Sequence, residues 1–151
     1  MAKLIYAFRD LYEPDLIYLQ EVVTAGQRGV DVGANLGIYA LVMAELVGQT
    51  GRGFAVEPAC EAFQLLQGNV SLNGLGNVTL SRTAVGDAAT VRRLYRYADP
   101  GRNSLGAARQ QVLGTEDVTM CTLDATLGNG GDTSIHFLKV DVEGAEELVL
   151  R

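Results

Sequence analysis

The chain has 151 residues, a length that fits one ordinary domain rather than two. Apolar residues make up 48% and charged residues 20%, and this globular balance excludes a disordered, collagen-like or coiled-coil chain. The formal charge of −6 without a basic stripe argues against a nucleic-acid partner, and no apolar run approaches the ~18 residues that would span a membrane.

Helical and extended patterns alternate along the chain. Residues 15–25 have apolar side chains at helical spacing and belong to a segment, 1–27, that we expect to be a helical lead-in. The predicted strands are residues 30–32, 53–57, 77–85, 91–97, 118–123 and 135–142. The other predicted helices are residues 36–47, a helix with Pro58 at its first position that ends at Asn73, and a helix that starts at residue 145. This alternation predicts an α/β fold: a Rossmann-like, doubly wound, mainly parallel sheet with helices on both faces.

Residues 135–142 form the strongest predicted strand. Its apolar side chains fall on both faces, which is typical of a strand in the middle of a parallel sheet. Doubly wound sheets bind ligands beyond the carboxyl ends of their strands, where the strand order reverses. We therefore expect the chemistry of this protein directly after Val32, Val56, Val85 and Val140.

A glycine turn follows the first strand, in the stretch Asp31-Val32-Gly33-Ala34-Asn35-Leu36-Gly37. Such a turn lets a ligand approach the backbone and the free N–H groups at a helix start. The dinucleotide fingerprint would be G-x-G-x-x-G, but Asn35 occupies the position of its second glycine. This difference argues against NAD or FAD, and a tight turn without any ligand is the alternative.

Acidic residues follow the next two strands. Glu57 is placed to accept hydrogen bonds from both hydroxyls of a ribose, although it could also cap the helix that Pro58 opens. Asp87, after Gly86, could bind an adenine amino group or belong to an ordinary Gly-Asp turn. The residues alone leave both choices open.

Charged residues also emerge at the end of the last strand. If the strands have the usual order, Asp141 faces the cleft next to Gly33. In the alternative interpretation, Lys139 pairs with Asp141 structurally, and Glu146 and Glu147 favour a helix N-terminus. The single histidine, His136, lies at the opposite end of this strand, where we expect a structural role.

The inventory of cysteine and histidine argues against several kinds of site. Cys60 and Cys121 are far apart and form no CxxC pair, so neither a disulfide nor a zinc site is predicted. One histidine without a clustered carboxylate pair leaves no basis for a metal site or a hydrolase triad. Residues 1–8 do not resemble a signal peptide, and we expect a cytoplasmic protein.

Together these motifs resemble the FkbM family of S-adenosylmethionine-dependent methyltransferases. The matching stretches are Tyr12-Glu13-Pro14, residues 31–39, Ala55-Val56-Glu57-Pro58, Asn69-Val70 with Asn73-Gly74, Ala84-Val85-Gly86-Asp87, Thr122-Leu123-Asp124 and residues 137–146. They follow the family's order over nearly the whole chain. The last stretch is the most specific, whereas the glycine motif would fit most methyltransferases of this fold.

The resemblance implies S-adenosylmethionine as cofactor and a hydroxyl on a sugar or natural product as methyl acceptor. The implied cofactor-binding residues are Asp31, Gly33, Asn35, Gly37, Glu57, Pro58, Gly86, Asp87 and Asp141. Asp141 and Glu143 would lie by the transferred methyl group, and our hypothesis is that one of them takes the hydroxyl proton. Asp141 could instead orient the amino group of the cofactor.

Methyltransferases of this kind continue with about three more strands, in line with a mean sheet of ~5–6 strands. We therefore expect residues 1–151 to be a single cofactor-binding domain that lacks its C-terminal strands. The strand at 135–142 would then be an exposed apolar edge and a site of self-association. A chain of this kind could also bind a cofactor or nucleotide as a module without turning over a substrate.

Overall fold

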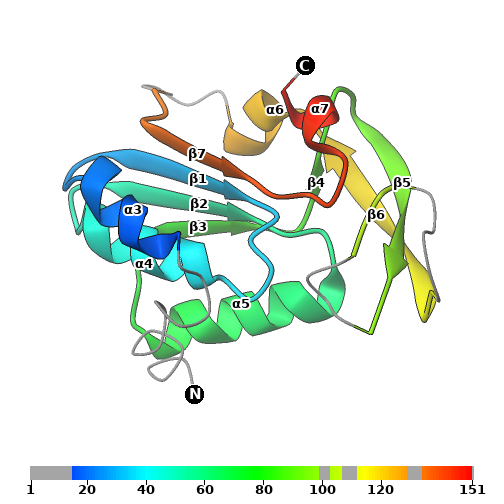
Figure 1. Ribbon diagram of the computed structural model, residues 1–151, viewed down its shortest axis with the longest axis horizontal. Coiled ribbons are helices and arrows are strands. Elements are labelled where there is room, and N and C mark those ends of the chain that lie inside the picture. The colour runs from blue at the N-terminus through cyan, green and yellow to red at the C-terminus, as the bar shows by residue number, and fades with distance from the viewer. Residues whose placement is uncertain (1–14, 99–102, 107–111, 129–133, 151) are drawn as a thin grey trace.

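The computed structural model describes residues 15–98, 103–106, 112–128 and 134–150. A four-stranded sheet in the order β3-β2-β1-β7 forms its centre (Figure 1). All strand pairs in this sheet are parallel, and the strand order reverses between β1 and β7. The strands are β1 (Arg28–Val32), β2 (Arg52–Val56), β3 (Val78–Ser81) and β7 (Phe137–Val140).

A second sheet of three strands, in the order β4-β6-β5, stands beside the carboxyl ends of the first (Figure 1). Its strands are β4 (Ala84–Val85), β5 (Thr90–Arg96) and β6 (Gly114–Cys121). β5 and β6 pair in antiparallel register, whereas β4 is parallel to β6. The second sheet thus interrupts the chain between the third and fourth strands of the first sheet.

Helices cover both faces of the four-stranded sheet (Figure 1). On one face lie α3 (Leu16–Val22), α4 (Ile38–Val47) and α5 (Cys60–Leu72). The short helices α6 (Leu123–Leu127) and α7 (Glu146–Val149) lie on the other. This arrangement confirms the predicted fold class. None of the described helices is long and apolar enough to cross a membrane.

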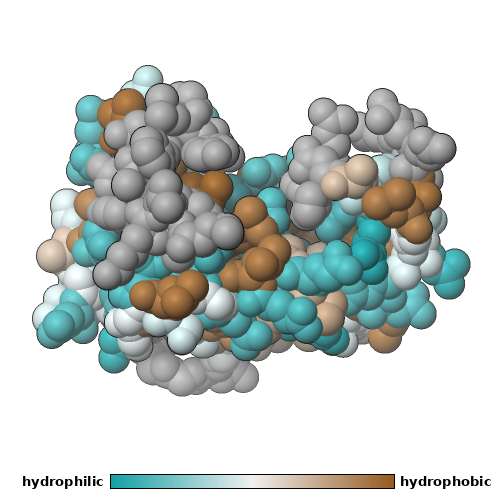
Figure 2. Space-filling model, turned by 90° about the horizontal axis from the view of Figure 1, so that it is seen from below, coloured by the Kyte–Doolittle hydropathy of each residue, from teal (hydrophilic) through white to brown (hydrophobic). Residues whose placement is uncertain are grey.

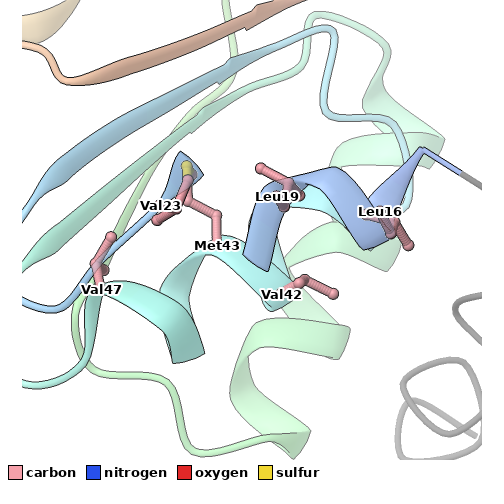
Figure 3. Close-up of a cluster of buried hydrophobic side chains, with 6 residues drawn as sticks. All are labelled: Leu16, Leu19, Val23, Val42, Met43 and Val47. Atoms are coloured by element: carbon pink, nitrogen blue, oxygen red, sulfur yellow. The ribbon is translucent and has the colours of Figure 1, made fainter. Parts of the chain in front are cut away.

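The alternation of side chains along β1 explains the two-sided core. Val30 and Val32 pack with Val149 of α7 on one face, whereas Asp31 points to the face that carries α4. On the α4 side, α3 and α4 share a cluster of buried side chains (Figure 3): Leu16, Leu19, Val23, Val42, Met43 and Val47. The central strand β1 is therefore covered on both faces, as expected of a strand inside a parallel sheet.

Hydrophobic side chains are also found on the surface. In the space-filling view from below, they form separate patches among hydrophilic residues (Figure 2). Leu65 and Leu72 of α5 are more than half exposed, at 55% and 66%. Isolated exposed apolar residues of this kind are normal on globular proteins.

The predicted strand 77–85 is wrong as a single element. The chain leaves the first sheet after Ser81 and enters the second at Ala84. Between them, the buried Thr83 donates its hydroxyl to the carbonyl of Thr119 on β6, which holds the break in place. Because Ala84 and Val85 are apolar, the hydrophobic pattern runs across the break without a signal.

Two other boundaries differ from the prediction. The helix after Glu57 begins at Cys60 and not at Pro58, because the extended Ala59 is its N-cap. The strand predicted at 118–123 starts earlier, at Gly114, and ends at Cys121. Leu123 begins α6 instead, because the Thr122 hydroxyl accepts the N–H of Ala125 and caps that helix.

The strand predicted at 135–142 is shorter and lies at an edge. In the described part of the chain, β7 pairs with β1 alone, so the expectation of a central strand from its two-sided apolar pattern is not met. Leu138 is 36% exposed. The other expectation for this strand, an edge position, agrees with the described sheet.

Candidate functional site

A cavity of about 250 Å³ opens where β1, β2, β4 and β7 end and faces the second sheet. Its volume is just below the range usual for small-molecule pockets. Its polar lining residues are Asn35, Tyr39, Glu57, Thr83, Asn103, Lys139, Asp141 and Glu143. The cavity lies at the reversal of the strand order, where the sequence predicts the chemistry.

Gly33 forms the tightest point of the glycine turn. It has a φ of +79°, and a side chain there would overlap the carbonyl oxygen of Asp141. The N–H of Asp141 in turn donates to the carbonyl of Val32 at 3.0 Å. The strand order thus places Asp141 beside Gly33. The backbone of Asp141 alone leaves no room for a side chain at position 33, whether or not a ligand binds there.

Gly37 has a different environment. It is the left-handed N-cap of α4, and a Cβ there would lie 2.5 Å from the side chain of Leu66 on α5. Gly37 does not line the cavity, so the structure gives it a role in helix packing. Its contact with a cofactor stays a prediction.

Asn35 lies in the glycine turn between β1 and α4. Its φ is +49°, a conformation that asparagine tolerates better than most residues. Its backbone N–H donates to Glu57 Oε2 at 2.9 Å. Its own side-chain oxygen is buried and has no hydrogen-bond partner among the described residues. A buried acceptor of this kind at a cavity wall is suited to a ligand that donates a hydrogen bond.

Glu57 is the most constrained acid of the cavity. Its side chain is only 7% exposed, and its second oxygen, Oε1, accepts the N–H of Ala59 at 2.8 Å. Burial raises the pKa of the Glu57 carboxyl, while the N–H groups of Ala59 and Asn35 oppose that rise. The N-cap of α5 is Ala59, so Glu57 is not itself the helix cap considered from the sequence, although it accepts the N–H of that residue. A carboxylate oxygen can accept a further hydrogen bond from a ligand.

Lys139 lines the cavity, although the set of site residues predicted from the sequence omits it. Its ammonium donates to the carbonyl of Gly33 at 3.1 Å and lies 3.2 Å from Asp31 Oδ1 and 3.6 Å from Asp141 Oδ2. It also stands 5.0 Å from the ring centroid of Tyr39. A lysine inside an otherwise apolar strand was the available signal, because a charge there needs partners.

Asp31 lies behind the cavity wall and does not line the cavity. Its side chain is 1% exposed, and burial raises the pKa of its carboxyl against the opposing charge of Lys139. Direct contact between Asp31 and a cofactor, which the resemblance implies, stays a prediction.

Gly86 and Asp87 lie outside the cavity lining. Gly86 is buried against Met120, whereas Asp87 is exposed. This end of the cavity is formed instead by Thr83, Ala84 and Val85, and by Leu94 and Leu105 from the region of the second sheet. No local pattern could reveal these two leucines, because the place of the second sheet is set by tertiary packing.

Asp141 and Glu143 both line the cavity, and their side chains are largely open to solvent. The Asp141 side chain is 62% exposed. Glu143 has a φ of +52°, and its carbonyl accepts the hydroxyl of Ser104 at 2.8 Å, which links the loop after β7 to the segment 103–106. Pro58 lines the cavity as well, next to Glu57.

Glu146 and His136 make structural contacts, as the sequence-based interpretation of each residue expected. Glu146 accepts the N–H groups of Val142 and Gly144 at 3.2 and 3.1 Å, and these bonds hold the pKa of its carboxyl below the ordinary value. His136 accepts the N–H of Arg28 through Nδ1, at the end of the sheet away from the cavity. Among the described residues, no three His, Cys, Asp or Glu side chains are grouped so as to hold a metal ion.

The comparisons with known proteins agree with this fold. The model of the methyltransferase FkbM domain matches residues 31–151. The crystal structure of a methyltransferase FkbM from Methylobacillus flagellatus KT covers 89% of this chain and 35% of that chain, with 17% identity and a TM-score of 0.55. At this identity the likeness shows the fold alone.

Two further relatives match parts of the chain. A protein-L-isoaspartate O-methyltransferase from Methanococcoides burtonii is 36% identical over 58 residues, which is 38% of this chain and 29% of that protein. A SAM-dependent O-methyltransferase from Thermotoga maritima is 29% identical, covers 51% of this chain and 30% of that one, and has a TM-score of 0.47. The chain thus spans between 29% and 35% of the length of these three relatives.

Proposed function

Because the chain belongs to the FkbM methyltransferase family, we propose that it binds S-adenosylmethionine in the cavity beyond β1, β2 and β7. S-adenosylmethionine is the cofactor of this family. We further propose that the protein methylates a hydroxyl group on a sugar or natural product. Both the identity of the methyl acceptor and the activity of the whole protein are part of what we propose.

The observation that carries the proposal is the position of Glu57. Its carboxylate is held by two backbone N–H groups at the end of β2 and still lines the cavity. A carboxylate at the end of the second strand is suited to accept the two vicinal hydroxyls of a ribose. The unpartnered side-chain oxygen of Asn35 adds a second acceptor to the same wall.

The charge of the site fits the same ligand. Three carboxylates, from Glu57, Asp141 and Glu143, line the cavity, and Lys139 is the one cation among its described lining residues. Asp31 adds a fourth carboxylate behind the wall. S-adenosylmethionine carries a sulfonium and an ammonium group, so a cavity with excess negative charge favours it over an anionic nucleotide.

In the proposed reaction, the cofactor and the protein have separate tasks. Bound S-adenosylmethionine supplies a methyl group that its positive sulfur already activates. The chain has to align the acceptor and accept a proton from its hydroxyl. Asp141 and Glu143 are the carboxylates placed for that task, and a base adds roughly 10²–10⁴-fold to such a rate. In the alternative role, Asp141 orients the cofactor's amino group.

Isothermal titration with S-adenosylmethionine tests the binding proposal. We expect measurable binding, and Glu57→Ala should weaken it by at least about tenfold because a buried acceptor is removed. Glu21→Ala removes an exposed acid on α3, away from the cavity, and serves as the control. No binding by the wild-type chain would refute the proposal.

A methyl-transfer assay on hydroxylated acceptors tests the catalytic part. Asp141→Asn should lower turnover while the dissociation constant of S-adenosylmethionine stays the same. Unchanged turnover with intact binding would reject Asp141 as the base. A weakened dissociation constant would instead support its role in orienting the amino group. Glu143→Gln, measured in parallel, tests the second candidate base.

A second candidate function is cofactor binding without turnover. The observation that favours it is the 62% exposure of the Asp141 side chain, because methyl transfer benefits from an acceptor site closed to water. Titration and transfer assay together separate the two candidates. Binding of S-adenosylmethionine without methyl transfer to any acceptor would favour this second function, cofactor binding without turnover.

We also propose that β7 mediates self-association. In the described part of the chain one edge of β7 is unpaired, and the exposed Leu138 lies on this strand. An open parallel edge offers backbone N–H and C=O groups to another strand. A second copy of the chain could pair there.

A further inference from the structure

Lys139 occupies the junction of β1 and β7. In the parallel register its Cα is the partner of Asp31 on β1. Its side chain is only 16% exposed, and the Asp31 side chain is 1% exposed. The register thus places a partly buried ammonium against a buried carboxylate, next to the turn at Gly33.

The ammonium of Lys139 lies near three oxygen-bearing groups of the chain. An ammonium carries three N–H groups and no acceptor. The carbonyl of Gly33 lies at 3.1 Å, the Asp31 carboxylate at 3.2 Å and the Asp141 carboxylate at 3.6 Å. The contact with Gly33 is a hydrogen bond and the two contacts with carboxylates are ion pairs, so groups of the chain itself hold the ammonium, although the residue lines the cavity.

Two of these acceptors belong to the parts of the site that face the cavity. The N–H of Gly33 donates to the carbonyl of Val56, so the peptide groups on either side of Gly33 are both held. Its neighbour Asn35 is held through its own N–H by Glu57. Lys139 fixes the Gly33 carbonyl from the β7 side and lies opposite the carboxylate of Asp141, which is otherwise solvent-exposed.

We infer that Lys139 is a positioning residue of the cofactor site: it holds the Gly33 turn and the Asp141 carboxylate in a fixed relation, and it donates no hydrogen bond to the cofactor. This inference rests on the proposed function. Two other roles make different predictions. Lys139 could serve only to neutralise the buried Asp31, or it could bind the carboxylate of the cofactor directly.

The test uses a charge-neutral pair of substitutions. Lys139→Met keeps the aliphatic stem but leaves Asp31 as an unpaired buried charge, so we expect a clear loss of thermal stability. Asp31→Asn combined with Lys139→Met removes both charges and should recover most of the melting temperature. Asp31→Asn alone is measured in parallel, because it keeps the contacts of Lys139 with Gly33 and Asp141 and so isolates the effect of removing the Asp31 charge.

The decisive measurement is the affinity of the double variant for four ligands by titration: S-adenosylmethionine, S-adenosylhomocysteine, its analogue without the α-carboxylate, and adenosine. We expect affinity about tenfold or more below wild type for the three ligands with an amino-acid-derived chain, because lost charge-assisted contacts no longer hold the turn. Adenosine affinity should stay within about twofold of wild type, because Glu57 and Asn35 are retained.

Three outcomes would overturn the inference. Wild-type affinity in the double variant would show that Lys139 only neutralises Asp31. A loss for carboxylated ligands that disappears for the analogue without the carboxylate would show direct contact with the cofactor. An equal loss for adenosine would show general damage to the fold. If the wild-type chain binds none of the ligands, the proposed function fails first and separately.

Discussion

The two sheets of this protein contribute to one cavity in different ways. The four-stranded sheet is parallel, and four of the five residues of its central strand β1 are buried. In the second sheet, β5 has one buried residue, Leu94, in seven. Polar groups that need exact placement, such as Glu57 and Lys139, come from the strand ends of the first sheet.

The second sheet provides apolar surface and exposed ion pairs. Leu94 lines the cavity, whereas Arg92 and Arg93 are exposed and Arg96 is half-buried, and none of the three lines the cavity. Arg93 lies 3.6 Å from Asp117 with both side chains more than 60% exposed, and Arg96 pairs with Glu61 at 2.9 Å. Exposed pairs of this kind contribute little to stability. The comparison indicates that the first sheet sets the chemistry of the site and the second closes one side of it.

The largest effect should come from Gly33→Ala in the first sheet. Its positive φ and the overlap with the Asp141 carbonyl should together lower the free energy of unfolding by more than about 3 kcal/mol. Gly74→Ala is the control, because Gly74 has a φ of +66° but open space around its Cα, and it should cost about 1 kcal/mol. Urea denaturation measures both. Equal losses of unfolding free energy in the two variants would show that the backbone at the β1–β7 junction can shift to accommodate the added methyl group.

Leu94→Ala should produce the next largest effect, and only in the second sheet. Leu94 is 3% exposed, so its truncation should cost about 2 kcal/mol. Val91→Ala on the same strand changes a side chain that is 65% exposed and should stay within about 0.5 kcal/mol. Amide hydrogen exchange should accelerate in β5 and β6 but not in β1 and β2. Faster exchange in both sheets would mean that they unfold as one unit.

The pH dependence should separate two buried acids, Glu57 and Asp31, from Glu146, which is not buried. Burial raises the pKa of the Glu57 and Asp31 carboxyls, so the folded chain keeps these protons to higher pH than the unfolded chain. Stability from these groups should therefore fall as pH rises from about 4 through their raised pKa values. Glu146 has a lowered pKa, so its contribution is present above the ordinary carboxyl pKa and is lost as pH falls.

Melting temperatures between pH 3 and 7 check both signs. In Glu57→Gln the fall toward higher pH should become shallower. In Glu146→Gln the fall toward acid should become shallower instead. The same change in slope for both variants would contradict the assigned directions.

The smallest effect concerns the free edge of the first sheet. Leu138→Lys places a charge on the edge strand β7 and should reduce self-association with little change in stability, because Leu138 is 36% exposed. Sedimentation at several concentrations measures the change. Leu113→Lys, which alters a 68% exposed leucine preceding β6, is the matched control. Equal effects of the two substitutions would argue against pairing through β7.

The sequence predicts the first sheet better than the second for a physical reason. Short apolar runs separated by amphipathic or apolar helices encode β1, α4, β2 and α5 locally, and each appears in the structure near its predicted position. The exit from the first sheet at Arg82 has no such signal, because apolar residues resume at Ala84. Which sheet a short strand joins depends on distant partners.

The residues of the candidate site also differ in how far the sequence predicts their positions. Glu57 and Asn35 follow strand ends, so their place at the cavity can be read from chain order and fold class. The pair of Lys139 and Asp141 is one of the alternatives from the sequence, whereas the contact of Lys139 with Asp31 depends on the register between β1 and β7, which no local pattern specifies. Leu94 and Leu105 reach the cavity through the fold of the second sheet. Local sequence thus locates the strand ends, but tertiary packing decides what faces them.

The neighbouring positions of β1 and β7 have a consequence for the order of folding. The bond from Lys139 to the Gly33 carbonyl joins residues 106 positions apart in the chain. Contacts at such separation form late, since the closure of a long loop costs entropy before any contact compensates for it. During synthesis, the first three strands and the whole second sheet emerge before β7 can add to β1. In a nascent chain, the contacts of Lys139 with the Gly33 turn therefore form after both the turn itself and the second sheet have been synthesised.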